Sequence, residues 1–169
     1  MKKNIRSITV TLFTFLILIG PANLLGQDSS VSTPWIPFDQ MVESNQDQPK
    51  KIMLFMEADW CSVCKRMKRE VFPNPAIQTL LSDHFYPVRI DIESDEEIIF
   101  ADERITKKEL SKEFGIRGTP TIIFLDSDFS VIGNKVGYSD QKEFTTLLKF
   151  INEEEYNHTS FDKYQQNTH

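Results

Sequence analysis

Cys61 and Cys64, separated by two residues, are the only cysteines in the 169-residue chain. A CxxC pair can act as a catalytic dithiol, supply half of a metal site or form a structural disulfide, depending on its surroundings. A zinc site would need two further ligands, and the remaining candidates are His84, His158 and His169. Zinc sites usually combine one CxxC with a second close-spaced pair, which this chain lacks, so we expect no metal.

The residues around the pair indicate how it is held. An apolar run over residues 51–58 leads directly into it and has the length of a buried central strand. Charged residues dominate one side of the stretch 61–69 and apolar residues the other, which predicts a helix. At a helix N-terminus, free backbone N–H groups and the helix dipole favour a thiolate. This placement favours Cys61 as the nucleophile and Cys64, on the first turn, as the thiol that resolves a mixed disulfide.

The rest of the chain alternates helical and strand patterns. Helices are predicted over residues 37–49, 76–85, 107–116 and 140–154, and strands over residues 86–92, 119–126 and 129–137. A two-residue turn between the last two strands predicts an antiparallel hairpin. The order of these elements predicts an α/β fold with a central mixed sheet and helices on both faces.

The chain begins with a basic and then apolar segment. Lys2, Lys3 and Arg6 precede an apolar run that ends near Pro21, a pattern typical of a secretory signal peptide over residues 1–26. An uncleaved membrane anchor is the alternative, because the run approaches the roughly 20 residues that a membrane span needs. In both cases we expect a periplasmic or otherwise extracytoplasmic domain that meets the membrane only through this segment.

The remaining boundaries follow from composition. The sequence predicts a linker over 27–36, a single domain over 37–154, an acidic insertion or surface loop over 93–106 and a flexible polar tail over 155–169. The formal net charge is −6, and loss of residues 1–26 would make it −9. An acidic domain binds nucleic acid poorly, so no nucleic-acid partner is expected.

With the stretches WCSVCK and GIRGTPT, this arrangement resembles the thioredoxin-like family, and within it the exported thioredoxins of the sulfur-oxidation-associated and thiol reductase types. The resemblance implies a thioredoxin-like fold and thiol-disulfide oxidoreductase activity, with no cofactor beyond the redox-active cysteine pair. It also implies that Trp60 flanks the site where a substrate docks. Pro120 would be a cis-proline against the dithiol, and Thr119 would offer its backbone to an extended substrate. The alternatives are simple packing for Trp60 and a trans proline that opens an edge strand.

Two features depart from the thioredoxin pattern. Thioredoxins place a buried aspartate six residues before the first cysteine, where this chain has Phe55. Glu57 shares a strand face with Phe55 and is the candidate replacement for proton transfer, unless it is an ordinary strand-end carboxylate. The dipeptide Ser62–Val63 between the cysteines matches no stereotyped class. No histidine adjoins Cys61 to stabilise its thiolate, which favours a reducing protein.

Three functions remain open on the sequence. The favoured one is reduction of disulfides in protein substrates, with electrons supplied by a membrane thiol-electron transporter. An oxidase or isomerase would use the same residues in the opposite direction, since only the potential sets direction. A protein-binding module would use the thioredoxin-like fold as a scaffold, with the acidic insertion as its partner surface.

Overall fold

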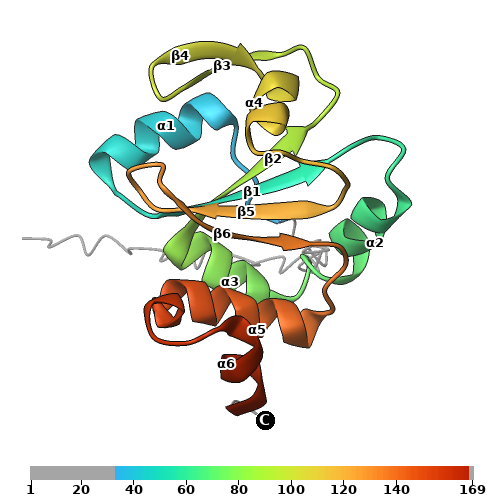
Figure 1. Cartoon of the computed structure of the whole chain (residues 1–169), viewed down its shortest axis with the longest axis vertical. Coiled ribbons are helices and arrows are strands. Elements are labelled where there is room, and N and C mark those ends of the chain that lie inside the picture. The colour runs from blue at the N-terminus through green and yellow to red at the C-terminus, as the bar shows by residue number, and fades with distance from the viewer. Residues whose placement is uncertain (1–32, 168–169) are drawn as a thin grey trace, which may run out of the picture. The chain divides into compact units, whose positions relative to one another are not determined.

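A four-stranded mixed sheet forms the centre of the computed structural model, which describes residues 33–167 (Figure 1). Its strands are β1 (Lys51–Glu57), β2 (Phe85–Asp91), β5 (Thr121–Leu125) and β6 (Val131–Val136), in the spatial order β2-β1-β5-β6. β1 pairs in parallel with β2 and antiparallel with β5, and β5 pairs antiparallel with β6. The predicted mixed sheet and the predicted hairpin are confirmed, although residues 126–130 connect its two strands instead of the predicted two-residue turn. The predicted signal peptide lies outside the described residues.

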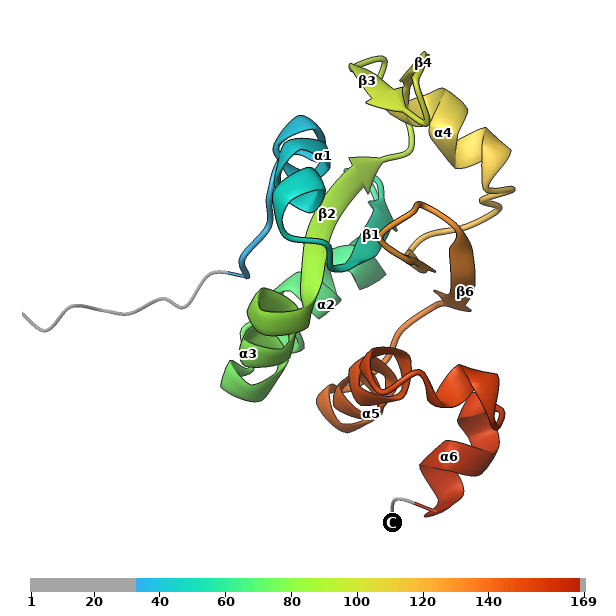
Figure 2. The same cartoon turned by 90° about the vertical axis from the view of Figure 1, so that its left-hand side faces the viewer.

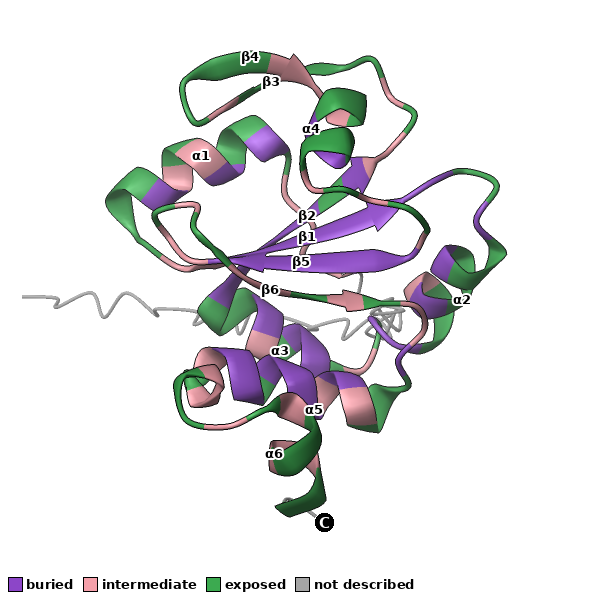
Figure 3. Cartoon of the chain, in the orientation of Figure 1, coloured by how far each residue is buried: buried purple, intermediate pink, exposed green. Residues whose placement is uncertain are grey.

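Helices cover both faces of this sheet (Figure 2). One face packs against α1 (Phe38–Asp47) and α4 (Lys107–Glu113). The other packs against α2 (Ser62–Glu70), α3 (Pro75–His84) and α5 (Gln141–Asn152). Because helices lie on both sides, β1 is buried from its second residue onward and β5 along its whole length (Figure 3). The edge strand β6 has no buried residue.

Aromatic rings fill the core on the α2 side of the sheet. Phe72, fully buried just after α2, lies 5.0 Å from the ring of Phe55 and 5.5 Å from that of Phe144, between ring centroids. Trp35 adds a fourth ring, 5.0 Å from Phe72 and 5.7 Å from Phe55. Trp35 belongs to the predicted linker, so the packed part of the chain begins earlier than the sequence predicted. The apolar area of the indole explains why this side chain is partly buried against the core.

The acidic stretch 93–106 contains an ordered hairpin. Of the two predictions for this stretch, a surface loop is wrong, and an insertion stays a prediction. Strands β3 (Glu97–Phe100) and β4 (Glu103–Thr106) pair antiparallel in a separate two-stranded sheet. The turn residues Ala101 and Asp102 have φ of 49° and 67°, in the left-handed region that a tight hairpin turn needs. Ile98 is buried and Phe100 packs against Phe38 of α1, so apolar burial holds the hairpin against the domain.

The C-terminal residues also differ from the prediction of a flexible tail. A 3₁₀ helix, η1 (Glu155–Asn157), and a helix, α6 (Phe161–Asn167), follow α5. The rings of Phe161 and Tyr164 lie 5.5 and 5.3 Å from the ring of Phe150 on α5. The polar composition hid this contact, because two aromatic residues three apart on a helix are enough to form an apolar face.

Tyr164 makes the attachment of α6 sensitive to alkaline pH. Burial and a 2.9 Å hydrogen bond that its hydroxyl donates to Glu153 raise the pKa of Tyr164 to about 12. The folded state therefore holds this proton more tightly than the unfolded chain, whose tyrosine pKa is about 10. The resulting stabilisation is complete below about pH 10 and is lost as the pH rises towards 12.

We therefore expect the free energy of unfolding to fall more steeply between about pH 10 and 12 in the wild type than in Tyr164→Phe. Denaturant unfolding at a series of pH values measures both slopes, and the comparison cancels the titration of other groups. Identical slopes in the two proteins would contradict the assignment.

Candidate active site

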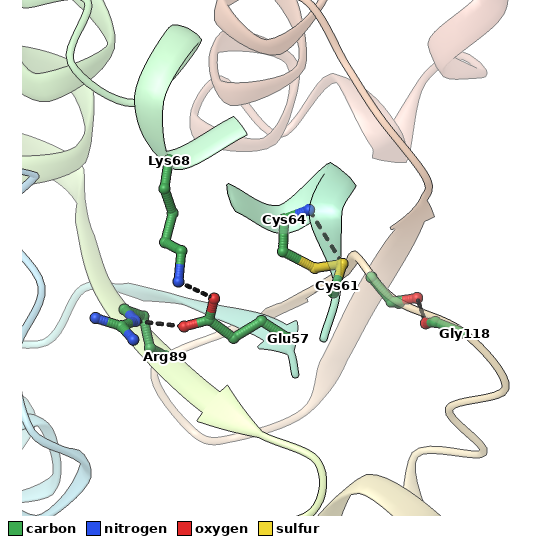
Figure 4. The surroundings of a disulfide bond; sticks show 7 residues. Glu57, Cys61, Cys64, Lys68, Arg89 and Gly118 are labelled. Atoms are coloured by element: carbon green, nitrogen blue, oxygen red, sulfur yellow. Dashed lines mark hydrogen bonds and ion pairs between the residues drawn. A yellow bond between two sulfur atoms is a disulfide. The ribbon is translucent and has the colours of Figure 1, made fainter. Parts of the chain in front are cut away.

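A disulfide joins Cys61 and Cys64 at the N-terminus of α2, with the two Cα atoms 5.3 Å apart (Figure 4). Cys61 is the N-cap residue, and its Sγ accepts a 3.0 Å hydrogen bond from the backbone N–H of Cys64. The buried strand β1 ends at Glu57, and the turn that follows is closed by a 3.0 Å hydrogen bond from Cys61 N–H to Ala58 O. A buried central strand of the sheet thus leads directly into the pair, as the sequence predicted.

The two cysteines differ in access. Cys64 is completely buried, whereas Cys61 keeps 3% of its surface exposed. Beside them, Trp60 is 62% exposed and Val63 is 38% exposed, although both are large apolar side chains. Exposed apolar residues next to a reactive group are typical of a docking surface. Cys61 reaches this surface, whereas Cys64 does not.

Gly118, in the loop before β5, is among the residues that surround the disulfide (Figure 4). The Thr119–Pro120 peptide bond is cis, as the resemblance implied, and Pro120 is buried. The Thr121 hydroxyl donates a 2.8 Å hydrogen bond to Gly118 O, and Gly137 N–H donates one of 2.8 Å to Pro120 O. These two bonds fix the shape of the loop and tie it to the start of β5 and to Gly137.

Glu57 is buried close to the disulfide, but its carboxylate is directed towards two cations (Figure 4). One oxygen accepts a 2.5 Å hydrogen bond from Arg89 Nε, and the other forms an ion pair with Lys68 Nζ. Arg89 lies on β2 and Lys68 on α2, so this carboxylate ties both elements to the end of β1. Its role in proton transfer stays a prediction, whereas its ionic contacts are a structural feature that the sequence did not indicate.

Replacing Glu57 with glutamine should destabilise the protein by about 2 kcal/mol, because two cations lose a hydrogen-bonded carboxylate. The loss stays below that for a fully buried pair, since the side chains of Lys68 and Arg89 are 30% and 49% exposed and can be solvated. Denaturant unfolding measures it. Glu70→Gln is the matched control, because Glu70 pairs with Arg66 at the surface and should matter little.

The same variant tests the predicted proton transfer. If Glu57 takes the proton of the resolving thiol, Glu57→Gln should slow substrate reduction near neutral pH and change the shape of its pH profile. A profile of unchanged shape would restrict Glu57 to the structural role.

Sequence reasoning did not pair Lys68 or Arg89 with Glu57. Lys68 follows Cys64 by one helical turn, so its position on the same face of α2 could have been inferred. Arg89 could not, because its contact depends on the parallel register of β1 and β2, in which it lies opposite Phe55. Among residues 33–167, no cluster of histidine, cysteine or acidic side chains could hold a metal ion.

Residues 37–152 match the protein family described as a thioredoxin-like domain. The chain belongs to the thioredoxin-like family. It is 27% identical over 119 residues to the thiol:disulfide interchange protein DsbD of Photorhabdus laumondii subsp. laumondii. This match covers 69% of the present chain. The match spans only 19% of that relative, so the chain corresponds to a small part of it.

Solved structures show the same fold. A thioredoxin-fold protein from Helicobacter pylori is 23% identical, with a TM-score of 0.63 over 70% of this chain and 79% of the other. The oxidised C-terminal domain of DsbD from Neisseria meningitidis is 22% identical, with a TM-score of 0.52 over 68% of this chain and 90% of the other. The family and the CxxC pair together support thiol-disulfide oxidoreductase activity. Within residues 33–167, no helix has the length and apolar character to cross a membrane.

Proposed function

We propose that this protein is an exported thiol-disulfide oxidoreductase that reduces disulfides in protein substrates. The observation that carries the proposal is the Cys61–Cys64 pair at the N-terminus of α2, with the Pro120 loop beside it. Export is inferred from the basic residues and the apolar run within residues 1–26.

Cys61 is the proposed nucleophile of the reduced protein. The backbone N–H of Cys64 is directed at the Cys61 sulfur, and the N-terminus of α2 adds a favourable dipole, so both stabilise a Cys61 thiolate. Cys61 is also the more exposed of the two cysteines. No equivalent donor is directed at the sulfur of Cys64 in the described part of the chain, which suits Cys64 to the second step.

The reaction then proceeds in two exchanges. The Cys61 thiolate attacks one sulfur of a substrate disulfide, the substrate S–S bond breaks, and one substrate thiolate leaves while a mixed disulfide forms. Cys64 loses its proton and attacks the Cys61 sulfur, which releases the second substrate thiolate. The substrate gains two electrons and the protein is left as the Cys61–Cys64 disulfide, the form that the structure contains.

The surroundings of the pair suit a polypeptide substrate. Trp60 and Val63 offer exposed apolar surface on one side, and Thr119 at the cis-proline is proposed to offer its backbone on the other. A dithiol donor must restore the reduced form after each turnover. We propose a membrane thiol-electron transporter for this step, by analogy with the thiol:disulfide interchange relatives.

The reduction potential of the pair tests the direction. Equilibration of the full chain in dithiothreitol or glutathione buffers, followed by thiol alkylation, should give a value near thioredoxin's, about −270 mV. A value near about −120 mV would contradict reduction and make the protein a disulfide donor.

A further inference from the structure

A groove of about 490 Å³ lies between α1 and the β3–β4 hairpin. These elements lie together on the side of the sheet opposite α3 and α5, apart from α2 and its cysteine pair (Figure 1). The groove has an apolar floor, because buried Phe38 and Ile98 and half-buried Val42 all line it. It is therefore a second recessed surface, separate from the disulfide.

The walls of this groove are strongly acidic. Five carboxylate residues line it: Asp39, Glu43, Glu96, Glu97 and Asp102. The one basic residue in the lining, Arg104, is paired with Glu97 at 3.0 Å, and Lys107 outside it is paired with Glu96 at 2.6 Å. Asp39, Glu43 and Asp102 are exposed and form no ion pair with any residue between 33 and 167. The groove thus keeps three negative charges that no basic side chain of the described residues pairs with.

Two of these charges repel each other. Asp39 and Glu43 are four residues apart on α1 and lie on the same face, an arrangement of like charges that destabilises a helix. On the opposite wall, Ile99 is 55% exposed, although it adjoins the buried Ile98. Cations placed between the carboxylates, and an aliphatic group placed on Ile99, would relieve both unfavourable features together.

We propose that this groove binds a segment of a partner protein that carries both basic and aliphatic side chains. Negative charge on both walls selects against acidic segments and the phosphates of nucleic acids or anionic lipids. The apolar floor adds burial of aliphatic side chains to the ionic attraction, so the groove favours a segment that carries both kinds of residue. Because the groove is apart from the cysteine pair, it can be occupied while the disulfide remains open to exchange. The proposal does not depend on the direction of the redox reaction.

Binding of two labelled 12-residue peptides to the full chain tests this proposal by fluorescence anisotropy. One peptide contains lysine and leucine, and the other contains glutamate and leucine. The lysine peptide should bind more tightly. The triple variant Asp39→Asn, Glu43→Gln, Asp102→Asn should weaken it by about tenfold at low salt, because three surface charge contacts are lost. Ile99→Ser should weaken it independently of salt, through loss of apolar contact.

The matched control neutralises three exposed acids outside the groove: Asp83→Asn, Glu113→Gln and Asp162→Asn. It has the same net charge as the groove variant, so it should bind the lysine peptide as the wild type does. If both triple variants bind the lysine peptide equally weakly, net charge alone would explain the loss of affinity, and the proposal would be overturned. Equal affinity for the two peptides would also overturn it. So would a wild-type dimer that Ile99→Ser converts to a monomer in sedimentation, since the groove would then bind a second copy of this chain.

Discussion

Replacing Cys61 with serine should lower the rate of disulfide reduction by at least about a thousandfold, because a serine hydroxyl cannot replace the attacking thiolate. The environment of Cys61 differs from that of Cys64. Cys61 Sγ accepts the N–H of Cys64 at 3.0 Å at the start of α2, whereas the sulfur of Cys64 belongs to a completely buried residue. Reduction of a protein disulfide, followed with dithiothreitol as electron donor, measures the loss.

Cys64→Ser is the matched control for this experiment. It keeps the nucleophile but removes the resolving thiol, so Cys61 should accumulate as a mixed disulfide with the substrate. Non-reducing electrophoresis of the two variants, after incubation with a cell-envelope extract, separates the two roles. Mixed disulfides through Cys64 in the Cys61→Ser protein, with none in Cys64→Ser, would reverse the assignment of roles. The absence of a trapped species in both would count against catalysis by this pair.

Replacing Phe72 with alanine should destabilise the protein by about 4 kcal/mol, a large part of the roughly 5–15 kcal/mol that holds a domain folded. Phe72 is fully buried and contacts three other rings, those of Trp35, Phe55 and Phe144, at centroid distances of 5.0 to 5.5 Å. The substitution leaves a cavity and removes three aromatic pairs together. Denaturant unfolding of the oxidised protein measures the change.

Two further variants show whether the loss comes from this packing. Phe72→Leu keeps most of the volume but also removes the three aromatic pairs, so it should cost about 2 kcal/mol, roughly half the loss for alanine. Val136→Ala removes an apolar side chain that is 64% exposed, and its effect should stay within about 0.5 kcal/mol. A similar loss for Phe72→Ala and Val136→Ala would contradict the central position of Phe72 in the core.

Local patterns were enough to predict the redox pair and its immediate supports. The apolar run into Cys61, the two-residue spacing to Cys64 and the amphipathic stretch after them each depend on neighbours along the chain. Strand burial and helix capping act over such short distances, so the sequence alone predicted a dithiol at a helix N-terminus. The family resemblance added the cis bond at Pro120, which no local pattern would have indicated.

Errors arose where a short apolar signal lay inside a polar segment. Ile98 in the acidic stretch and Phe161 in the C-terminal residues are each among a few apolar residues in charged surroundings. Average composition predicts solvent exposure for both segments. In the structure each packs on a neighbouring element, Ile98 on the α1 side of the sheet and Phe161 on Phe150 of α5. A small apolar face is stable only when another element of the fold offers an apolar surface for it to pack against. The composition of a segment gives no information about that other surface.

The order of its residues alone determined that this protein is a mixed α/β domain with a redox-capable cysteine pair at the start of a helix. Only the tertiary structure decided what surrounds that pair. Glu57 meets Arg89 through the register of two parallel strands and Lys68 through the packing of α2, and the acidic groove exists because the hairpin lies beside α1. These contacts join residues distant in the sequence, and their free energy depends on burial and geometry that are established only when the whole chain has packed.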